Sequence, residues 1–141
     1  MRMIFVNLPV KSVAASRAFF GALGYGFNEQ FSNEETACMV VDENIFVMLL
    51  EHQRFRDFIT GEISDATKAT EVLTCLSTDS RAEIDDILAK ALAAGAKPWK
   101  PVLDMGPMYG CSFQDLDGHV WEYMYMDMAA IGDAMPAAAG A

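Results

Sequence analysis

The chain has 141 residues, of which 52% are hydrophobic, and a formal net charge of −10. This length and composition favour one globular domain with a sizeable core and exclude a disordered chain. The negative charge argues against nucleic-acid binding, because phosphate backbones are bound by basic surfaces. Such a charge is typical of a soluble protein, and it also favours a cationic ligand or partner.

The apolar runs are short, and one of the longest, NIFVMLLE at residues 44–51, cannot span a bilayer. The first residues contain no small-residue cleavage site, so we expect no signal peptide and no membrane association. Cys38, Cys75 and Cys111 are odd in number, far apart and without a C-x-x-C pair. This pattern favours reduced thiols in a cytoplasmic protein.

The first half of the sequence predicts a strand, a helix and three further strands. The apolar segment 3–10 is the first strand, and Ser12 is the candidate N-cap of a helix over residues 12–24. Short strands are expected at residues 26–31, 36–41 and 45–51, with a turn at residues 42–44 between the last two.

The second half repeats this order. A strand over residues 71–78 leads to a capping box, Ser80 to Glu83, and to a helix over residues 81–95. Strands are expected at residues 97–102, 109–115 and 119–126. The turn at residues 115–118 places Gly118 where a positive φ is needed.

We therefore expect a single domain over residues 1–128. It consists of module one (about residues 1–52), a connector (about 53–69) and module two (about 70–128). The connector has no clean period and contains one helical turn near residues 55–59. Residues 129–141 are mostly small and predict a flexible tail.

The repeated order of elements, with the motif D-x-D-G-x-x-x-E at residues 115–122, resembles the vicinal oxygen chelate superfamily. Its members include glyoxalase I, bleomycin-resistance proteins, fosfomycin-resistance enzymes and extradiol dioxygenases. The resemblance covers about residues 3–127. It implies an α+β fold in which two βαβββ modules form a curved, mixed eight-stranded sheet with a concave ligand cavity. Because many members dimerise, it also implies a homodimer.

Metal-dependent members of this superfamily hold a divalent ion such as Ni, Zn, Fe or Mn on the first and last strands of each module. The corresponding residues here are Phe5, Met48, Leu73 and Glu122. Only Glu122 is a suitable ligand, and catalytic metals need about three protein ligands. We therefore expect no complete metal site and no cofactor. A displaced metal site with Asn7, Cys75 and Glu122 as its ligands is the remaining alternative.

Alternation along the strands assigns a set of candidate residues to the concave cavity implied by the resemblance. Tyr109 shares a face with Cys111 and Phe113, so it is as consistent with core packing as with the cavity. The aromatics Trp121 and Tyr123 are assigned to the core. The candidate cavity residues are Phe5, Asn7, Met48, Leu73, Cys75, Tyr109, Glu122 and Met124.

Other charged residues are read mainly as surface groups. Arg54 and Arg56 in the connector are solvated or hold an anionic ligand group at the cavity mouth. His52 and His119 lie outside the ligand positions of the superfamily, and we expect His119 to face solvent. The DLDG turn is not an EF-hand loop, because that pattern needs Gly and Glu where this chain has valine and methionine.

Three functions remain open. The favoured one is a glyoxalase/bleomycin-resistance-like protein that binds a small organic ligand in its cavity without a complete metal site. The second is a metal-dependent lyase or isomerase that resembles glyoxalase I (lactoylglutathione lyase), with Glu122 as a metal ligand. The third is metal-independent catalysis with Glu122 as general base. Because burying a carboxylate without partners is costly, we expect a hydrogen-bond partner, a ligand or a raised pKa at Glu122 in each case.

Overall fold

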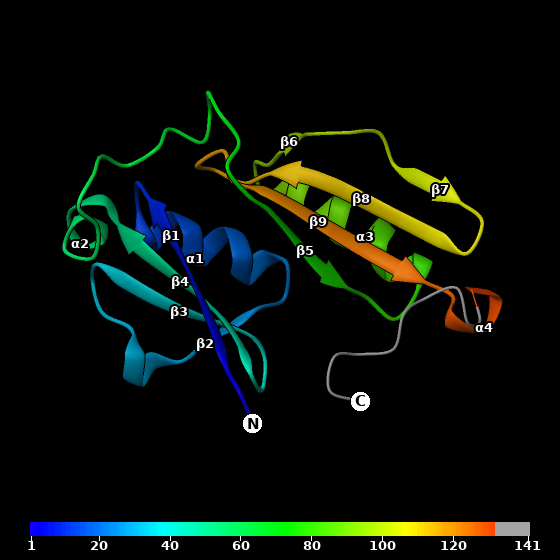
Figure 1. Cartoon of the computed structure of the whole chain (residues 1–141), viewed down its shortest axis with the longest axis horizontal. Coiled ribbons are helices and arrows are strands. Elements are labelled where there is room, and N and C mark those ends of the chain that lie inside the picture. The colour runs from blue at the N-terminus through cyan, green and yellow to red at the C-terminus, as the bar shows by residue number, and fades with distance from the viewer. Residues whose placement is uncertain (132–141) are drawn as a thin grey trace.

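The computed structural model describes residues 1–131 and contains two βαβββ modules (Figure 1). In each module a helix covers one face of a small mixed sheet. The α+β class and the duplicated module predicted from the sequence are confirmed. Within residues 1–131, no helix has the length and apolar character needed to cross a bilayer.

Module one forms a four-stranded sheet in the order β1-β4-β3-β2, in which β1 and β4 are parallel. The short 3₁₀ helix η1 (Glu29–Phe31) replaces the second half of the strand predicted at residues 26–31. The other elements are β1 (Ile4–Val10), α1 (Val13–Ala22), β2 (Gly26–Phe27), β3 (Thr36–Asp42) and β4 (Ile45–Glu51).

Module two forms a sheet in the order β5-β9-β8-β6, with β7 paired to β8. The predicted eight strands therefore divide between two sheets, and β7 is a ninth strand that the sequence did not predict. β1 and β5 are edge strands of their sheets. The elements are β5 (Leu73–Ser77), α3 (Arg81–Ala93), β6 (Lys97–Pro98), β7 (Leu103–Met105), β8 (Met108–Gln114) and β9 (Val120–Met126).

The connector and the end of the described chain contain two short helices. α2 (His52–Arg56) begins directly after β4, three residues before the helical turn that the sequence predicts. α4 (Met128–Ile131) occupies the start of the predicted tail. The rest of that tail, residues 132–141, lies outside the described residues.

Both long helices begin at the predicted caps. The Ser12 hydroxyl accepts a hydrogen bond from Ala15 N at 3.1 Å, and the Ser80 hydroxyl accepts one from Glu83 N at 3.1 Å. The Glu83 carboxylate in turn accepts one from Asp79 N at 2.8 Å. These bonds satisfy backbone donors that have no partner inside the helix. The sequence therefore located both helix starts correctly.

One hydrophobic core extends through both modules. Phe20 of α1 packs edge-on against Trp121 of β9, with ring centroids 5.1 Å apart. Phe19 of α1 packs against Phe113 of β8 at 6.1 Å. The Tyr123 hydroxyl, also on β9, lies 2.6 Å from the Tyr25 hydroxyl after α1. Trp121 and Tyr123 thus lie in the core as predicted, and the two modules share their most buried aromatic residues.

The shared core predicts a large effect for Phe20→Ala. Phe20 is 1% exposed, so its removal leaves a cavity between the modules, and we expect a loss of about 3–5 kcal/mol in the free energy of unfolding. Phe58→Ala is the matched control, because Phe58 is 63% exposed. Urea denaturation of both variants measures the difference. Equal losses for the two variants would contradict the shared core.

Candidate functional site

The faces of the two sheets that are not covered by α1 and α3 turn to the same side of the molecule. In Figure 1 both helices lie behind the sheets, and these open faces turn to the viewer. Because side chains alternate along a strand, each open face carries every second residue of its strands.

The strand registers place the predicted ligand positions of the two modules at equivalent points. Met48 of β4 lies opposite Asn7 of β1, and Glu122 of β9 lies opposite Cys75 of β5. Phe5 and Leu73 lie two residues before Asn7 and Cys75 on their strands. Met48 and Glu122 therefore occupy equivalent backbone positions in the two modules, but their side chains differ in chemistry.

The residues present at these positions do not fit a divalent metal ion. Only Glu122 among the four offers a hard ligand, and among residues 1–131 no three His, Cys, Asp or Glu side chains gather as a potential metal site. Cys75 lies beside Glu122, but desolvation and the negative charge of Glu122 raise the pKa of its thiol. Thiols bind metals as thiolates, so this shift opposes metal binding by Cys75 at neutral pH.

Glu122 is half-buried on the open face of module two, between Cys75 and Ser112 on the neighbouring strands. The Ser112 hydroxyl accepts a hydrogen bond from Lys100 N at 3.1 Å and is not bonded to Glu122. Glu122 makes no hydrogen bond or ion pair with the other described residues. Of the three expected forms of compensation for this carboxylate, a hydrogen-bond partner is therefore not found within residues 1–131.

Tyr109 does not lie on the open face. Its hydroxyl donates a hydrogen bond to Asp85 of α3 at 2.6 Å, and the Arg81 guanidinium lies 4.6 Å from the centre of its ring. This hydrogen bond to Asp85 raises the pKa of the Tyr109 hydroxyl. Because side chains alternate along β8, Tyr109 lies on the same side of the sheet as the buried Cys111 and Phe113, which is the side covered by α3. Assigning Tyr109 to the cavity was therefore wrong.

A hollow of about 320 Å³ lies over the open face of module one. We call it the strand hollow. Three predicted cavity residues, Phe5, Asn7 and Met48, line it together with Cys38. The Phe5 ring stacks on Phe46, with centroids 4.9 Å apart. The other predicted residues on the open faces do not line this hollow, and these are Leu73, Cys75, Glu122 and Met124. The sequence prediction assigned all of these residues to one cavity, but within a single chain they do not share one.

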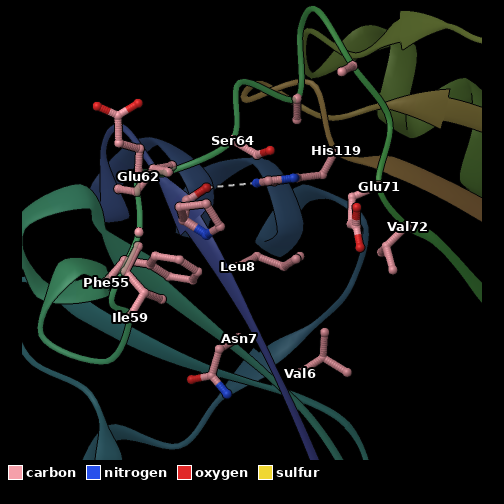
Figure 2. A pocket seen from close by; sticks show the side chains of 15 residues that line it. Val6, Asn7, Leu8, Phe55, Ile59, Glu62, Ser64, Glu71, Val72 and His119 are labelled. Carbon is pink, nitrogen blue, oxygen red and sulfur yellow. Dashed lines mark hydrogen bonds between the residues drawn. The ribbon is translucent and has the colours of Figure 1, made fainter.

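A second hollow, of about 380 Å³, lies between β1 and the connector (Figure 2). We call it the connector pocket, and Asn7 lines both it and the strand hollow. Figure 2 shows Leu8, Phe55, Ile59 and Val72 around its interior. The side chains of Ser64, Glu62, Glu71 and His119 add a few polar groups. An apolar pocket with few polar groups is the usual form of a small-molecule site.

His119 joins the two modules at this pocket, so the expectation that it faces solvent was wrong. Its Nε2 lies 2.7 Å from the Pro9 carbonyl oxygen of β1, within hydrogen-bond distance. Nearby, the Asp117 carboxylate accepts a hydrogen bond from Lys11 N at 2.8 Å. The turn before β9 therefore docks onto the end of β1. In the sequence, the only indication of this contact is that His119 directly follows a Gly-containing turn.

Asp115 fixes the conformation of this turn. Its carboxylate is buried and accepts hydrogen bonds from Trp121 Nε1 at 2.9 Å, from Asp117 N at 2.9 Å and from His119 N at 3.0 Å. Gly118 has a φ of 91°, as the sequence predicted for this position. The D-x-D-G-H segment thus positions a histidine, and its first carboxylate has a structural role.

The connector residues of the pocket were not predicted as site residues. Phe55, Ile59 and Val72 are apolar residues in a segment without a clean period, and only folding places them over β1. The only sequence signal in such a segment is its composition, because loop residues gain their neighbours from tertiary structure. The fold, in contrast, is well represented among known proteins.

Residues 2–42 match the profile of the family described as bleomycin resistance protein-like N-terminal. No curated protein sequence matches this chain significantly. Several solved structures are similar. A hypothetical protein from S. aureus is 24% identical, with a TM-score of 0.75 over 89% of this chain and 94% of that chain.

Two further solved structures are also similar to this chain. A glyoxalase/bleomycin resistance protein/dioxygenase family enzyme from Burkholderia phytofirmans is 16% identical, with a TM-score of 0.73 over 89% of this chain and 99% of that chain. A fosfomycin resistance protein from Listeria monocytogenes is 15% identical, with a TM-score of 0.65 over 89% of this chain and 93% of that chain. These similarities establish the fold.

The burial of Asp115 predicts a pH-dependent stability. Burial raises the pKa of this carboxyl above its usual value near 3.8, against the opposing effects of His119 and of the Trp121 hydrogen bond. The folded state therefore binds this proton more tightly than the unfolded chain. The resulting stabilisation is present below the usual pKa and is lost as pH rises through the raised value.

We accordingly expect the wild-type protein to lose stability relative to Asp115→Asn as pH rises above about 4. Urea denaturation of both proteins at a series of pH values measures this difference. The quantity compared is the change of the free energy of unfolding with pH. A pH-independent loss of stability caused by the substitution therefore does not affect the result. A difference that stays constant or changes in the opposite direction would contradict the effect of burial.

Proposed function

We propose that this chain, which has the fold of the vicinal oxygen chelate superfamily, binds a small and largely apolar organic molecule in the connector pocket. The observation that carries the proposal is the pocket itself. Its volume of about 380 Å³ suits a small molecule, and apolar side chains form most of its wall. The ligand extends from there toward Asn7 and the strand hollow.

The polar groups of the pocket give such a ligand an orientation. His119 lies at one end, where its hydrogen bond to the Pro9 carbonyl holds the ring in place. Asn7 lies where the pocket meets the strand hollow, and its side-chain amide donates to the Phe5 carbonyl at 3.1 Å. A few fixed polar groups in an apolar site are what confers specificity on small-molecule binding.

We do not extend the proposal to a metal-dependent lyase or isomerase of the glyoxalase I type. Phe5, Met48 and Leu73 stand at three of its four ligand positions, and none of these side chains binds a hard cation. Catalysis by Glu122 alone is not favoured either. A general base must reach the proton that it removes, and Glu122 does not line the strand hollow or the connector pocket.

Val72→Arg tests the binding proposal. Val72 lines the pocket and is 51% exposed, so the longer charged side chain fills the pocket without disturbing the core. We expect saturable binding of octan-1-ol by the wild-type protein and an affinity lower by roughly tenfold or more in the variant. Titration followed by NMR measures both.

Val102→Arg is the matched control, because Val102 is 42% exposed and does not line the pocket. It should bind octan-1-ol like the wild-type protein. If the wild-type protein shows no saturable binding of uncharged molecules of this size, or if Val72→Arg binds them normally, the proposed function is wrong.

We also propose that two chains associate through the edge strands β1 and β5. Within the described residues each of these strands pairs on one side only, with β4 and with β9. An unpaired strand edge is a template for pairing with another chain. Phe5 on β1 and Leu73 on β5 are large apolar residues that are about half exposed in the single chain. Both features support a homodimer.

Charged residues at these two positions should prevent association, because a lysine at a buried contact must be desolvated. We expect light scattering to give roughly twice the chain mass of 15.5 kDa for the wild type. The double variant Phe5→Lys, Leu73→Lys should give the mass of one chain. Leu116→Lys, at an exposed residue of the turn before β9, is the control. A monomeric wild-type protein would exclude the dimer.

A further inference from the structure

A third hollow, of about 360 Å³, adjoins the connector pocket. We call it the polar hollow. It shares His119 and Pro9 with the connector pocket, so the two spaces meet at the point where the modules are joined. Its other walls come from Lys11 just after β1, from α2, from the connector and from the turn before β9. Its chemistry differs from that of the connector pocket.

Basic side chains gather in the polar hollow. Both histidines of the chain, His52 and His119, line it together with Lys11 and Arg56. The whole chain has 10 Lys and Arg residues against 20 Asp and Glu residues, so this concentration opposes the overall charge. The two positive charges of Lys11 and Arg56 balance the two carboxylates that also line the hollow, whereas the whole chain has a net charge of −10. The hollow therefore repels an anion less than the rest of the chain does, and its two cations can hold one.

The cationic groups of this hollow are available to a ligand. Lys11 and Arg56 make no ion pair with any residue of the described chain 1–131. Other basic residues are paired with carboxylates at 2.7–3.0 Å, and these are Arg17, Arg54, Arg81 and Lys90. Arg54 and Arg56 lie on the same short helix. Arg54 is paired with Asp57, whereas Arg56 lines the hollow.

The two carboxylates that line the hollow are already engaged. Asp65 accepts hydrogen bonds from Thr67 N at 2.9 Å and from the Thr67 hydroxyl at 2.6 Å, and these bonds lower the pKa of its carboxyl. Asp117 accepts its bond from Lys11 N. Asp65 and Asp117 therefore help to shape the wall, and the side chains of Lys11 and Arg56 remain free for an external anion.

The wall of the hollow is preformed. The turn that contains Gly118 packs directly on the backbone of Ala66 and Thr67, and a Cβ at Gly118 would lie 2.8 Å from Thr67 N. Only glycine permits this approach, and its φ of 91° is also one that other residues rarely adopt. A preformed site loses less conformational entropy when it binds a ligand.

The connector pocket has the opposite character. Among residues 1–131 no lysine or arginine lines it, while Glu62 and Glu71 do, and Figure 2 shows both carboxylates at its margin. An anionic group is therefore less favoured in the connector pocket than in the neighbouring polar hollow, where two cations offset the two carboxylates. His119, which lines both, lies at the boundary between them.

From this arrangement we infer that the ligand is amphipathic, with its apolar body in the connector pocket and a carboxylate or phosphate group in the polar hollow. The part of this inference that concerns the apolar body rests on the proposed function above. The anionic group is held by Arg56 and Lys11, with the histidines beside it. Arginine suits this role because its planar guanidinium forms two parallel hydrogen bonds with an oxyanion.

A matched series of ligands tests the inference on the full-length protein. Octanoate, octyl phosphate, octan-1-ol and octylamine share one apolar chain and differ in the charge of the head group. We expect at least one of the two anions to bind about tenfold more tightly than octan-1-ol. Comparing octanoate with octyl phosphate identifies the preferred oxyanion. Equal affinities for the anions and octan-1-ol, or tighter binding of octylamine, would overturn the inference.

Arg56→Gln identifies the site. It should reduce the affinity for the preferred anion to about that for octan-1-ol and leave octan-1-ol binding unchanged. Arg54→Gln is the matched control, because it lies on the same helix, is paired with Asp57 and does not line the hollow. Equal effects of the two variants on anion binding would contradict the assignment.

Inorganic phosphate separates failure of this inference from failure of the proposed function. Titration of phosphate alone should shift the amide NMR signals of Lys11 and of residues 65–67 in a saturable way, and Arg56→Gln should weaken this response. Such shifts without octan-1-ol binding would support the anion site and reject the apolar site. Octan-1-ol binding without these shifts would overturn the anion site alone.

Discussion

The packing of α1 against the sheet of module two is the interaction on which the rest of the structure depends. Phe19 and Phe20 project from the helix of one module into the aromatic layer of the other, against Phe113 and Trp121. Residues of both modules surround these rings, so the two modules share one core. This contact determines the relative orientation of the sheets and turns both open faces to the same side.

The same contact creates the candidate site. Once the modules are packed, the turn before β9 reaches the end of β1, where His119 approaches the Pro9 carbonyl and Asp117 accepts from Lys11 N. The connector must then pass over β1, and the space beneath it becomes the connector pocket. The binding surfaces therefore lie at the junction of the modules, where residues that are distant in sequence meet.

Duplication of the module has preserved the backbone and not the side chains. Met48 and Glu122 occupy equivalent points in two sheets of the same design, yet one is a thioether and the other a carboxylate. A sheet register is maintained by backbone hydrogen bonds and by the buried face, so residues on the open face are free to change. This freedom explains how equivalent points of the two modules can carry a thioether in one and a carboxylate in the other.

The sequence by itself determined most of the secondary structure, the duplication and the fold class, because these follow from local signals. Ser12 and Ser80 cap their helices, Gly118 permits the turn, and alternation assigns Trp121 to the core. Only the tertiary structure decided the site. The pocket residues come from an irregular connector, His119 finds its partner 110 residues away, and Tyr109 turns to α3. Contacts between distant segments leave no periodic signal in the sequence, so they appear only when the chain is packed.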